Sequence, residues 1–144
     1  MDLKSLPETI RTIIEQVGGL GLHGAFTYIG ASKLTYRCSQ SEGEYRSGRP
    51  SSLKTEGTST FVDFEVGLSC KVNGKPGRSW SLIIAYEPDD TYAVWLVEGH
   101  AQRRADSMVL ACHRDVYCDT LKTTVECAYD EAIQEHNGGF IPLN

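Results

Sequence analysis

Residues 112–119, with the sequence CHRDVYCD, gather the residue types that most often do chemistry. They include two cysteines, a histidine, an arginine, a tyrosine and two aspartates. A thiol beside an imidazole could form a nucleophile pair, but neighbours on a strand point to opposite faces, so Cys112 and His113 are poorly placed to touch. The pattern therefore favours structural thiols over a catalytic pair.

Three motif-like patterns lack the context that their chemistry needs. Cys112, His113 and Cys118 could ligate zinc, but the cysteine spacing is not that of a zinc knuckle and no second matching pair exists. Residues 113–115 spell a kinase triplet without the rest of that signature. Residues 19–24 have the glycine spacing of a dinucleotide loop, but a helix is expected before them instead of a strand. We therefore expect no metal site and no cofactor.

A different set of residues could line a small-molecule pocket. Glu98 and His100 lie at the end of a predicted strand. Both have even numbers, like the residues of that strand that are expected to face the core. A carboxylate and an imidazole at the mouth of an aromatic-lined cavity could do acid–base chemistry. The residues of this hypothetical pocket are Trp80, Tyr86, Tyr92, Glu98 and His100. The alternative is that both polar groups lie in water beyond the strand, since charged residues are rarely buried without a partner.

Composition limits the classes of protein to which the chain can belong. Its 144 residues suit a single domain, expected to span residues 1–144. The formal net charge of −5 argues against nucleic-acid binding, and no apolar run approaches the roughly 20 residues of a membrane span. An odd count of five cysteines and an N-terminus unlike a signal peptide favour a cytoplasmic protein with buried thiols.

Charge is distributed unevenly along the chain. Residues 33–54 hold five basic and two acidic side chains, whereas residues 114–144 hold two basic and six acidic ones. Such segregation could favour docking of one subunit's basic loop on an acidic helix of another. The alternative is a solvated surface with no binding role.

Hydrophobic periodicity predicts a helix, several strands and a second helix. Apolar residues recur at helical spacing over about 6–17 and about 119–136. Strand patterns cover residues 24–30, 33–39, 61–72, 79–87, 91–98 and 107–112, and the Ser- and Gly-rich segment 39–59 is expected to be a flexible loop. This order predicts a two-layer α+β fold, with an antiparallel sheet of about 4–6 strands and both terminal helices packed on one face.

The alternation of even- and odd-numbered residues along the three long strands predicts which face of the sheet packs in the core. If Val72 faces Arg78 and Tyr86 faces Tyr92, the even-numbered residues of all three strands share one apolar face, Phe64 among them. A slip of one residue would expose the large side chains of that strand, which favours this register.

The opposite face of the sheet is mostly small and polar. In the same register, Gly67, Ile83 and Trp95 form one row across it. The glycine would leave a shallow recess beside an exposed Trp–Ile pair, which is typical of an interface. The alternative is that another element of the same chain covers this row.

Two functions follow as expectations. The first is a small cytoplasmic protein-binding or self-associating module, a homodimer or the partner of another protein, with Gly67, Ile83 and Trp95 as its interface and no enzymatic activity. The alternative is a small-molecule-binding protein or enzyme whose curved sheet wraps around a helix as a cone and holds the Trp80–Tyr86–Tyr92 pocket with Glu98 and His100. Neither hypothesis involves nucleic acid or a membrane.

Overall fold

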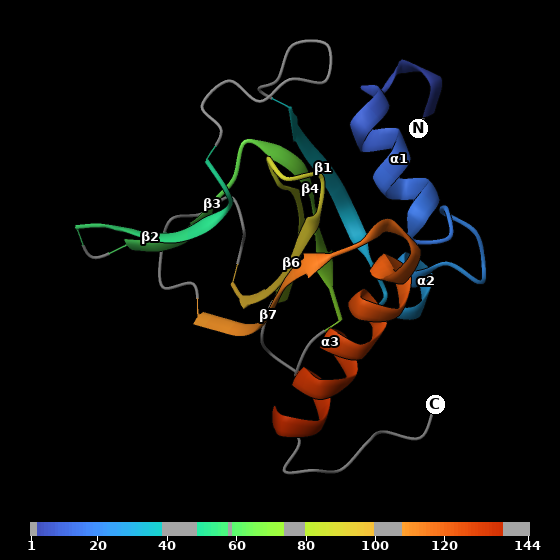
Figure 1. The fold of residues 1–144 in the computed structure, drawn as a ribbon. Helices are drawn as coiled ribbons and strands as arrows, with labels where there is room; N and C mark the ends of the chain where they lie inside the picture. Colours follow the sequence, from blue (N-terminus) through green and yellow to red (C-terminus); the bar gives the residue numbers. More distant parts are fainter. Residues whose placement is uncertain (1–2, 39–48, 58, 74–79, 100–107, 137–144) are drawn as a thin grey trace.

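The computed structural model describes residues 3–38, 49–57, 59–73, 80–99 and 108–136 (Figure 1). Its helical elements are η1 (Leu3–Ser5), α1 (Glu8–Gln16), α2 (Ala25–Tyr28), η2 (Cys118–Thr120) and α3 (Leu121–His136). Its strands are β1 (Ser32–Cys38), β2 (Ser52–Glu56), β3 (Ser59–Asp63), β4 (Val66–Val72), β5 (Trp80–Tyr86), β6 (Tyr92–Glu98) and β7 (Met108–Val116). The predicted α+β fold is confirmed. None of the described helices is long and apolar enough to cross a membrane.

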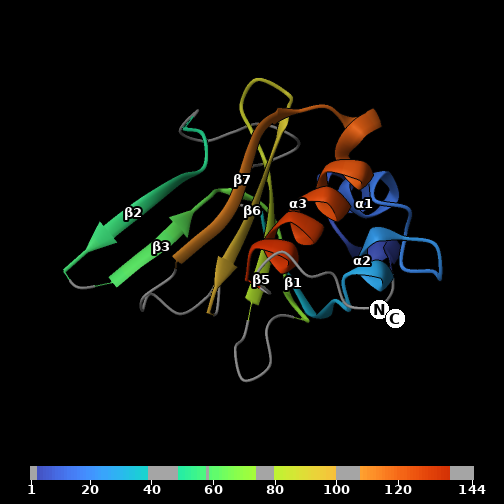
Figure 2. The ribbon, with the colours of Figure 1, turned by 90° about the horizontal axis from the view of Figure 1, so that it is seen from below.

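The strands form two antiparallel sheets. Five of them pair in the order β1-β4-β5-β6-β7, while β2 and β3 form a separate two-stranded hairpin. Figure 2 shows the helices on one side of the five-stranded sheet and the β2–β3 hairpin extending away on the other side. The chain therefore places structure on both faces of the central sheet.

The main core lies between the helices and the five-stranded sheet. From α1 it takes Ile10, Ile13 and Ile14, which recur at helical spacing and are at most 1% exposed. The sheet contributes alternating side chains of its three central strands, namely Val66, Leu68, Cys70, Val72, Trp80, Leu82, Ile84, Tyr92, Val94 and Leu96. Because full burial of one large apolar side chain is worth roughly 1.5–3 kcal/mol, this layer is the main source of stability.

The registers of the two long hairpins keep the predicted faces. Tyr86 lies opposite Tyr92, as predicted. Val72 lies opposite Trp80 instead of Arg78, which is a shift of two residues. Because side chains alternate with a period of two, this shift moves neighbours along the sheet without turning any side chain to the other face.

The apolar run 61–72 forms two strands, whereas its alternation predicts one. β3 ends at Asp63 and β4 begins at Val66, so the chain leaves strand geometry at Phe64 and Glu65. The first strand then pairs with β2, and the second with β1 and β5. The break carries Phe64 to the face opposite the helices, so its predicted place in the helix-covered core is wrong.

Three further segments differ from the sequence-based expectation. Residues 25–28 form the short helix α2 instead of a strand. Residues 52–56, inside the predicted loop 39–59, form β2, while residues 39–48 lie outside the described residues. β7 continues to Val116 instead of ending at Cys112. In each segment the local pattern is short, and contacts with other elements outweigh intrinsic propensity.

Cysteine burial was also predicted only in part. Cys70 is buried and Cys38 is half-buried, but Cys112, Cys118 and Cys127 are exposed. Burial raises the pKa of the Cys70 thiol to about 12, so it stays protonated at neutral pH. The three exposed thiols lie on β7, η2 and α3, in the half of the chain where the sequence placed the reactive-looking cluster.

Candidate functional site

The row predicted as an exposed interface is buried. Ile83 is 0% exposed and Trp95 is 5% exposed, and the two lie opposite each other as predicted. Gly67 is buried as well, although it lies opposite Ala85 instead of Ile83. The expectation of an exposed apolar sheet face is therefore wrong, because the same chain covers it.

The covering side chains come from the segment that joins β2 to β4. Val62, on β3, is 4% exposed and Phe64, at the break after β3, is 8% exposed. They form one apolar cluster with Ile83, Ala85, Ala93, Trp95 and Val97. This second core occupies the face that the helices leave open.

Gly67 allows the Phe64 side chain to pack closely on the sheet. A Cβ placed on Gly67 would lie 3.1 Å from Cδ2 of Phe64 and 3.0 Å from Cα of Ala85. The aromatic ring therefore fills the recess that the sequence predicts beside the glycine. Arg37 of β1 covers the outer side of the Phe64 ring. Its guanidinium lies 4.9 Å from the ring centroid, and its Nη1 donates to the Phe64 carbonyl at 3.1 Å.

Ser51, just before β2, joins the covered face to a buried carboxylate. The indole Nε1 of Trp95 donates to Ser51 Oγ at 3.0 Å. Ser51 Oγ donates to Glu87 Oε1 at 2.5 Å, and the Ser51 backbone N–H donates to Glu87 Oε2 at 2.8 Å. Glu87, which follows β5, is 5% exposed, and both its oxygens accept hydrogen bonds, as a buried carboxylate requires.

Arg114 of β7 completes this network from the other side. Its Nη1 donates to Glu87 Oε1 at 3.3 Å, and its Nη2 donates to the Ser51 carbonyl at 2.6 Å. The guanidinium also lies 5.0 Å from the centroid of the Trp95 ring. One arginine therefore neutralises the buried carboxylate, holds the chain before β2 and stacks on the aromatic ring beneath it.

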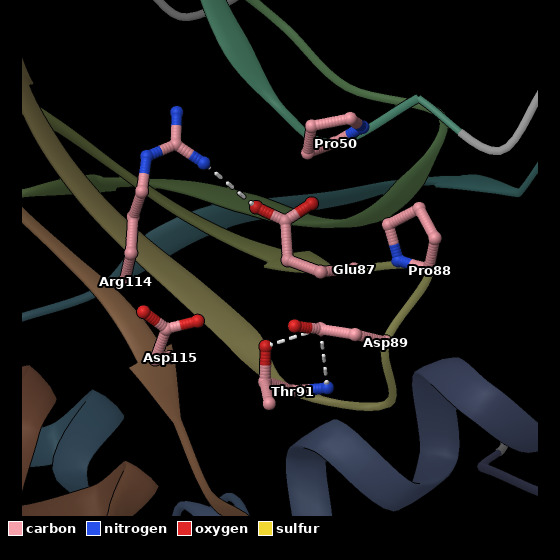
Figure 3. A pocket seen from close by; sticks show the side chains of 7 residues that line it. All are labelled: Pro50, Glu87, Pro88, Asp89, Thr91, Arg114 and Asp115. Atoms are coloured by element: carbon pink, nitrogen blue, oxygen red, sulfur yellow. Dashed lines mark hydrogen bonds and ion pairs between the residues drawn. The ribbon is translucent and has the colours of Figure 1, made fainter.

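Beside this network lies an open pocket of about 250 Å³ (Figure 3). Its lining residues are Pro50, Glu87, Pro88, Asp89, Thr91, Arg114 and Asp115. Three carboxylates against one guanidinium leave the lining with a formal net charge of −2. Because Arg114 is paired with Glu87, the excess negative charge belongs to Asp89 and Asp115.

The two excess carboxylates are positioned by turn and strand geometry. Oδ1 of Asp89 accepts from the Thr91 backbone N–H at 3.2 Å and from Thr91 Oγ1 at 2.6 Å, which fixes the turn between β5 and β6. Asp115 has a φ of 57°, a left-handed backbone that few residues other than glycine adopt. Figure 3 shows the two carboxylates on either side of Thr91.

The Ser51 hydroxyl next to the pocket is held within the hydrogen-bond network. The hydroxyl of Ser51 is engaged by Glu87 and Trp95, and Ser51 is only 2% exposed, so it is not presented as a nucleophile. Among the described residues, no three His, Cys, Asp or Glu side chains are grouped closely enough to hold a metal ion.

The residues of the alternative predicted pocket do not line this one. Trp80 is 1% exposed and packs edge-on against Tyr129 of α3, with ring centroids 6.5 Å apart. It lies opposite Glu98, as the predicted register requires in that hairpin. His100 falls outside the described residues. The hypothetical Glu98–His100 pair therefore stays a prediction.

The two tyrosines of that alternative pocket lie together at the other end of the same strands. The rings of Tyr86 and Tyr92 have centroids 5.7 Å apart. Burial, together with a 2.6 Å hydrogen bond to Asp90, raises the pKa of Tyr86 to about 12. Burial likewise raises the pKa of Tyr92. Both phenols are therefore neutral hydrogen-bond donors at ordinary pH.

The conspicuous cluster after Cys112 is divided between two faces. Cys112 lies opposite Trp95 and His113 opposite Val94, so the thiol and the imidazole sit on adjacent positions of one strand, which point to opposite faces. Nε2 of His113 lies 3.6 Å from Glu131 on α3. Partial desolvation raises the pKa of the Cys112 thiol although the residue is exposed, so less of the thiol is present as the nucleophilic thiolate at neutral pH.

The sequence patterns did not identify the residues that form the pocket and the hydrogen-bond network beside it. Arg114 and Asp115 lie beyond the predicted strand 107–112, but β7 extends to Val116 and carries both of them to the pocket. Glu87 is the last residue of the predicted strand 79–87, and an acidic residue at the end of a largely apolar strand is a signal that it needs a partner where it is buried. The partner, Ser51, lies 36 residues away, and no local pattern points to it.

The comparisons with known proteins add no relative. The chain matches no family model, no curated protein and no solved structure.

Proposed function

We propose that this protein is a small cytoplasmic protein-binding module whose pocket beside Glu87 receives a cationic side chain, lysine or arginine, of a partner protein. The observation that carries the proposal is the pair of carboxylates, Asp89 and Asp115, that gives the pocket its net negative charge. A carboxylate pair is the natural counterpart of an ammonium or guanidinium group.

The walls of the pocket also suit such a side chain. Pro50 and Pro88 are rigid and apolar, and lysine and arginine carry aliphatic stems that pack on surfaces of this kind while their charged heads reach further. Arg114 adds little repulsion, since it is already paired with Glu87 at 3.3 Å. The net charge of −5 would in addition steer a basic partner toward the protein.

The proposed function is still protein binding, as expected from the sequence, but the proposed binding site is the pocket beside Glu87. The row of Gly67, Ile83 and Trp95 becomes support for the binding site, because Trp95 positions Ser51 and lies under Arg114. The exposed thiols of Cys112 and Cys118 favour a reducing compartment, which agrees with a cytoplasmic location.

Titration with small probes tests the proposal. We expect N-acetylarginine amide and N-acetyllysine amide to shift the amide NMR signals of Ser51, Thr91 and Asp115 in a saturable way. N-acetylcitrulline amide has nearly the shape of the arginine probe without its charge, and it should cause much smaller shifts. Equal shifts with the charged and the neutral probe, or no shifts near the pocket, would rule out a cation site.

A further inference from the structure

Arg114 brings more hydrogen-bond donors to the pocket beside Glu87 than its contacts within the protein use. An arginine side chain has five N–H donors. The hydrogen bonds of Arg114 to Glu87 and to the Ser51 carbonyl use two of them, and its contact with the face of the Trp95 ring uses none. Among the described residues, the remaining three donors therefore have no acceptor, and 42% of the Arg114 side chain is exposed.

The same contacts hold the Arg114 guanidinium in place. Its partner Glu87 is 5% exposed and is itself fixed by two hydrogen bonds from Ser51. On its other side the guanidinium lies 5.0 Å from the centroid of the Trp95 ring. A planar guanidinium held by an ion pair and an aromatic ring loses little conformational freedom when it donates to a ligand. The unused donors are thus preorganised for an acceptor.

Glu87 divides the pocket into two charged ends. In Figure 3, the guanidinium of Arg114 lies on one side of it, and the carboxylates of Asp89 and Asp115 lie on the other. Asp115 has no hydrogen-bond or ion-pair partner among the described residues. Asp89 uses Oδ1 within its own turn. A ligand that spans the pocket therefore matches both ends if it carries a cation and, at a distance from it, a hydrogen-bond acceptor.

The charge of the pocket decides which kind of acceptor suits Arg114. The charge of Arg114 is already balanced by Glu87 at 3.3 Å, and the lining keeps a formal net charge of −2. The carboxylate of a ligand would be the fourth in the pocket and would be repelled by the other three. A neutral carbonyl oxygen has two lone pairs for N–H donors and adds no charge. The pocket therefore favours a carbonyl over a carboxylate.

A basic residue inside a polypeptide carries these two groups in the required arrangement. Its main-chain carbonyl is neutral, and its cationic head stands at the end of a flexible aliphatic stem. The pocket volume of about 250 Å³ lies below the roughly 300–1,000 Å³ of sites that enclose drug-sized ligands. An open pocket of this size suits one residue of a longer chain.

We propose that the pocket recognises an internal basic residue of a partner protein through two contacts. Asp89 and Asp115 bind the cation of its side chain, and Arg114 donates to its main-chain carbonyl. This specificity rests on the proposed function, since it presupposes the cation site. It disfavours simple amines, which have no carbonyl, and C-terminal basic residues, which end in a carboxylate. Arg114 is then the residue that determines which cations are bound.

Three probes with the same guanidinium group test this specificity on the wild-type protein. N-acetylarginine amide carries the cation and neutral carbonyls, butylguanidine carries the cation alone, and N-acetylarginine ends in a carboxylate. We expect butylguanidine to bind roughly three- to tenfold more weakly than the amide, because it makes no hydrogen bond with the charged donor. N-acetylarginine should bind roughly two- to fivefold more weakly than the amide, the usual effect of one exposed charge.

The NMR signals of Arg114 provide a direct readout of the second contact. Its side-chain N–H signals should shift with N-acetylarginine amide and stay in place with butylguanidine, whereas the backbone amide of Asp115 should shift with both probes. Asp115→Asn should weaken both probes and keep the ratio of their affinities, since both carry the cation.

Arg114→Lys keeps the charge beside Glu87 but has three donors instead of five. It should reduce the difference between the amide and butylguanidine to roughly twofold or less. Because Arg114 also supports Glu87 and Trp95, the probe series on the wild type decides the question where this variant does not fold.

The outcomes distinguish this specificity from the proposed function. Equal affinity for the amide and butylguanidine, with saturable shifts at Asp115, would overturn the role of Arg114 and leave a plain cation site. Tightest binding by N-acetylarginine would assign the pocket to a C-terminal residue, which would overturn it as well. Lack of binding by all three probes would overturn the proposed function itself, and the specificity with it.

Discussion

Gly67 shows how the lack of one side chain decides what covers a sheet face. Its neighbours are so close that any Cβ would press against the carbonyl oxygen of Ile84, which is the nearest atom, and against Ala85 and the Phe64 ring. Both the strand pairing with β5 and the packing of the Phe64 ring therefore favour glycine here. The sequence predicts an open recess at this position, whereas the structure fills the space with the Phe64 ring. The sequence does not predict that this ring comes from three residues earlier in the same chain.

Gly67→Ala should therefore destabilise the protein. We expect a loss of roughly 1–3 kcal/mol in the free energy of unfolding, the usual cost of overpacking a filled site. Urea denaturation measures it. Gly21→Ala is the matched control, because a Cβ there meets nothing within 4 Å. A wild-type midpoint for Gly67→Ala would contradict the tight packing of the β5 backbone and the Phe64 ring around this glycine.

Ser51 is the residue on which the pocket's floor depends. Ser51→Ala removes the acceptor of the Trp95 indole and a donor to Glu87, both of them buried. Unsatisfied buried groups cost about 1–3 kcal/mol, so we expect a loss of that order in urea unfolding followed by tryptophan fluorescence. Ser32→Ala on exposed β1 should stay within about 0.5 kcal/mol of the wild type. Equal stability of the two variants would show that the network carries no energy.

At the scale of elements, helices and sheet are joined by a few polar contacts besides the core. The hydroxyl of Tyr28, at the end of α2, donates to both carboxylate oxygens of Asp130 on α3 at 2.8 and 2.9 Å. Tyr129 of α3 donates to the carbonyl of Asn73 after β4 at 2.6 Å. The first contact holds the short helix α2, which has little stability of its own, against α3, and the second joins α3 to the end of β4.

The Tyr28–Asp130 contact predicts a pH dependence. The hydrogen bond to Asp130, aided by burial, raises the pKa of Tyr28 from 10.0 to about 12. A raised pKa means that the folded state holds the proton more tightly, so the contact stabilises the protein fully below pH 10 and is lost as the pH rises through about 12.

Ultraviolet titration of tyrosinate checks this prediction. The difference between the wild type and Tyr28→Phe isolates this phenol, and its midpoint should lie near 12. In Asp130→Asn the same difference should move toward 10, while Glu131→Gln on the neighbouring position should leave it in place. A Tyr28 midpoint near 10 in the wild type would exclude the contact.

At the scale of the whole molecule, the strands and their core face could be predicted from local alternation, but the contacts between segments far apart in the sequence could not. The alternation of β5 and β6 predicts both the core face and the pairing of Tyr86 with Tyr92. Nothing local predicts the break at Phe64, because the residues on both sides continue the same alternation. The break is decided by contacts such as that between Ser51 and Trp95, which lie 44 residues apart. The covering of the sheet face that carries Trp95 and the formation of the pocket both depend on these long-range contacts.

The most direct test of the account is the affinity of N-acetylarginine amide for the wild type and for Asp115→Asn. Glu135→Gln is the matched control, since it removes the same charge from an exposed position on α3. We predict that Asp115→Asn weakens binding roughly two- to fivefold, the worth of one exposed charge pair, and that Glu135→Gln does not. Equal affinity of the two variants, or no binding by the wild type, would contradict the account.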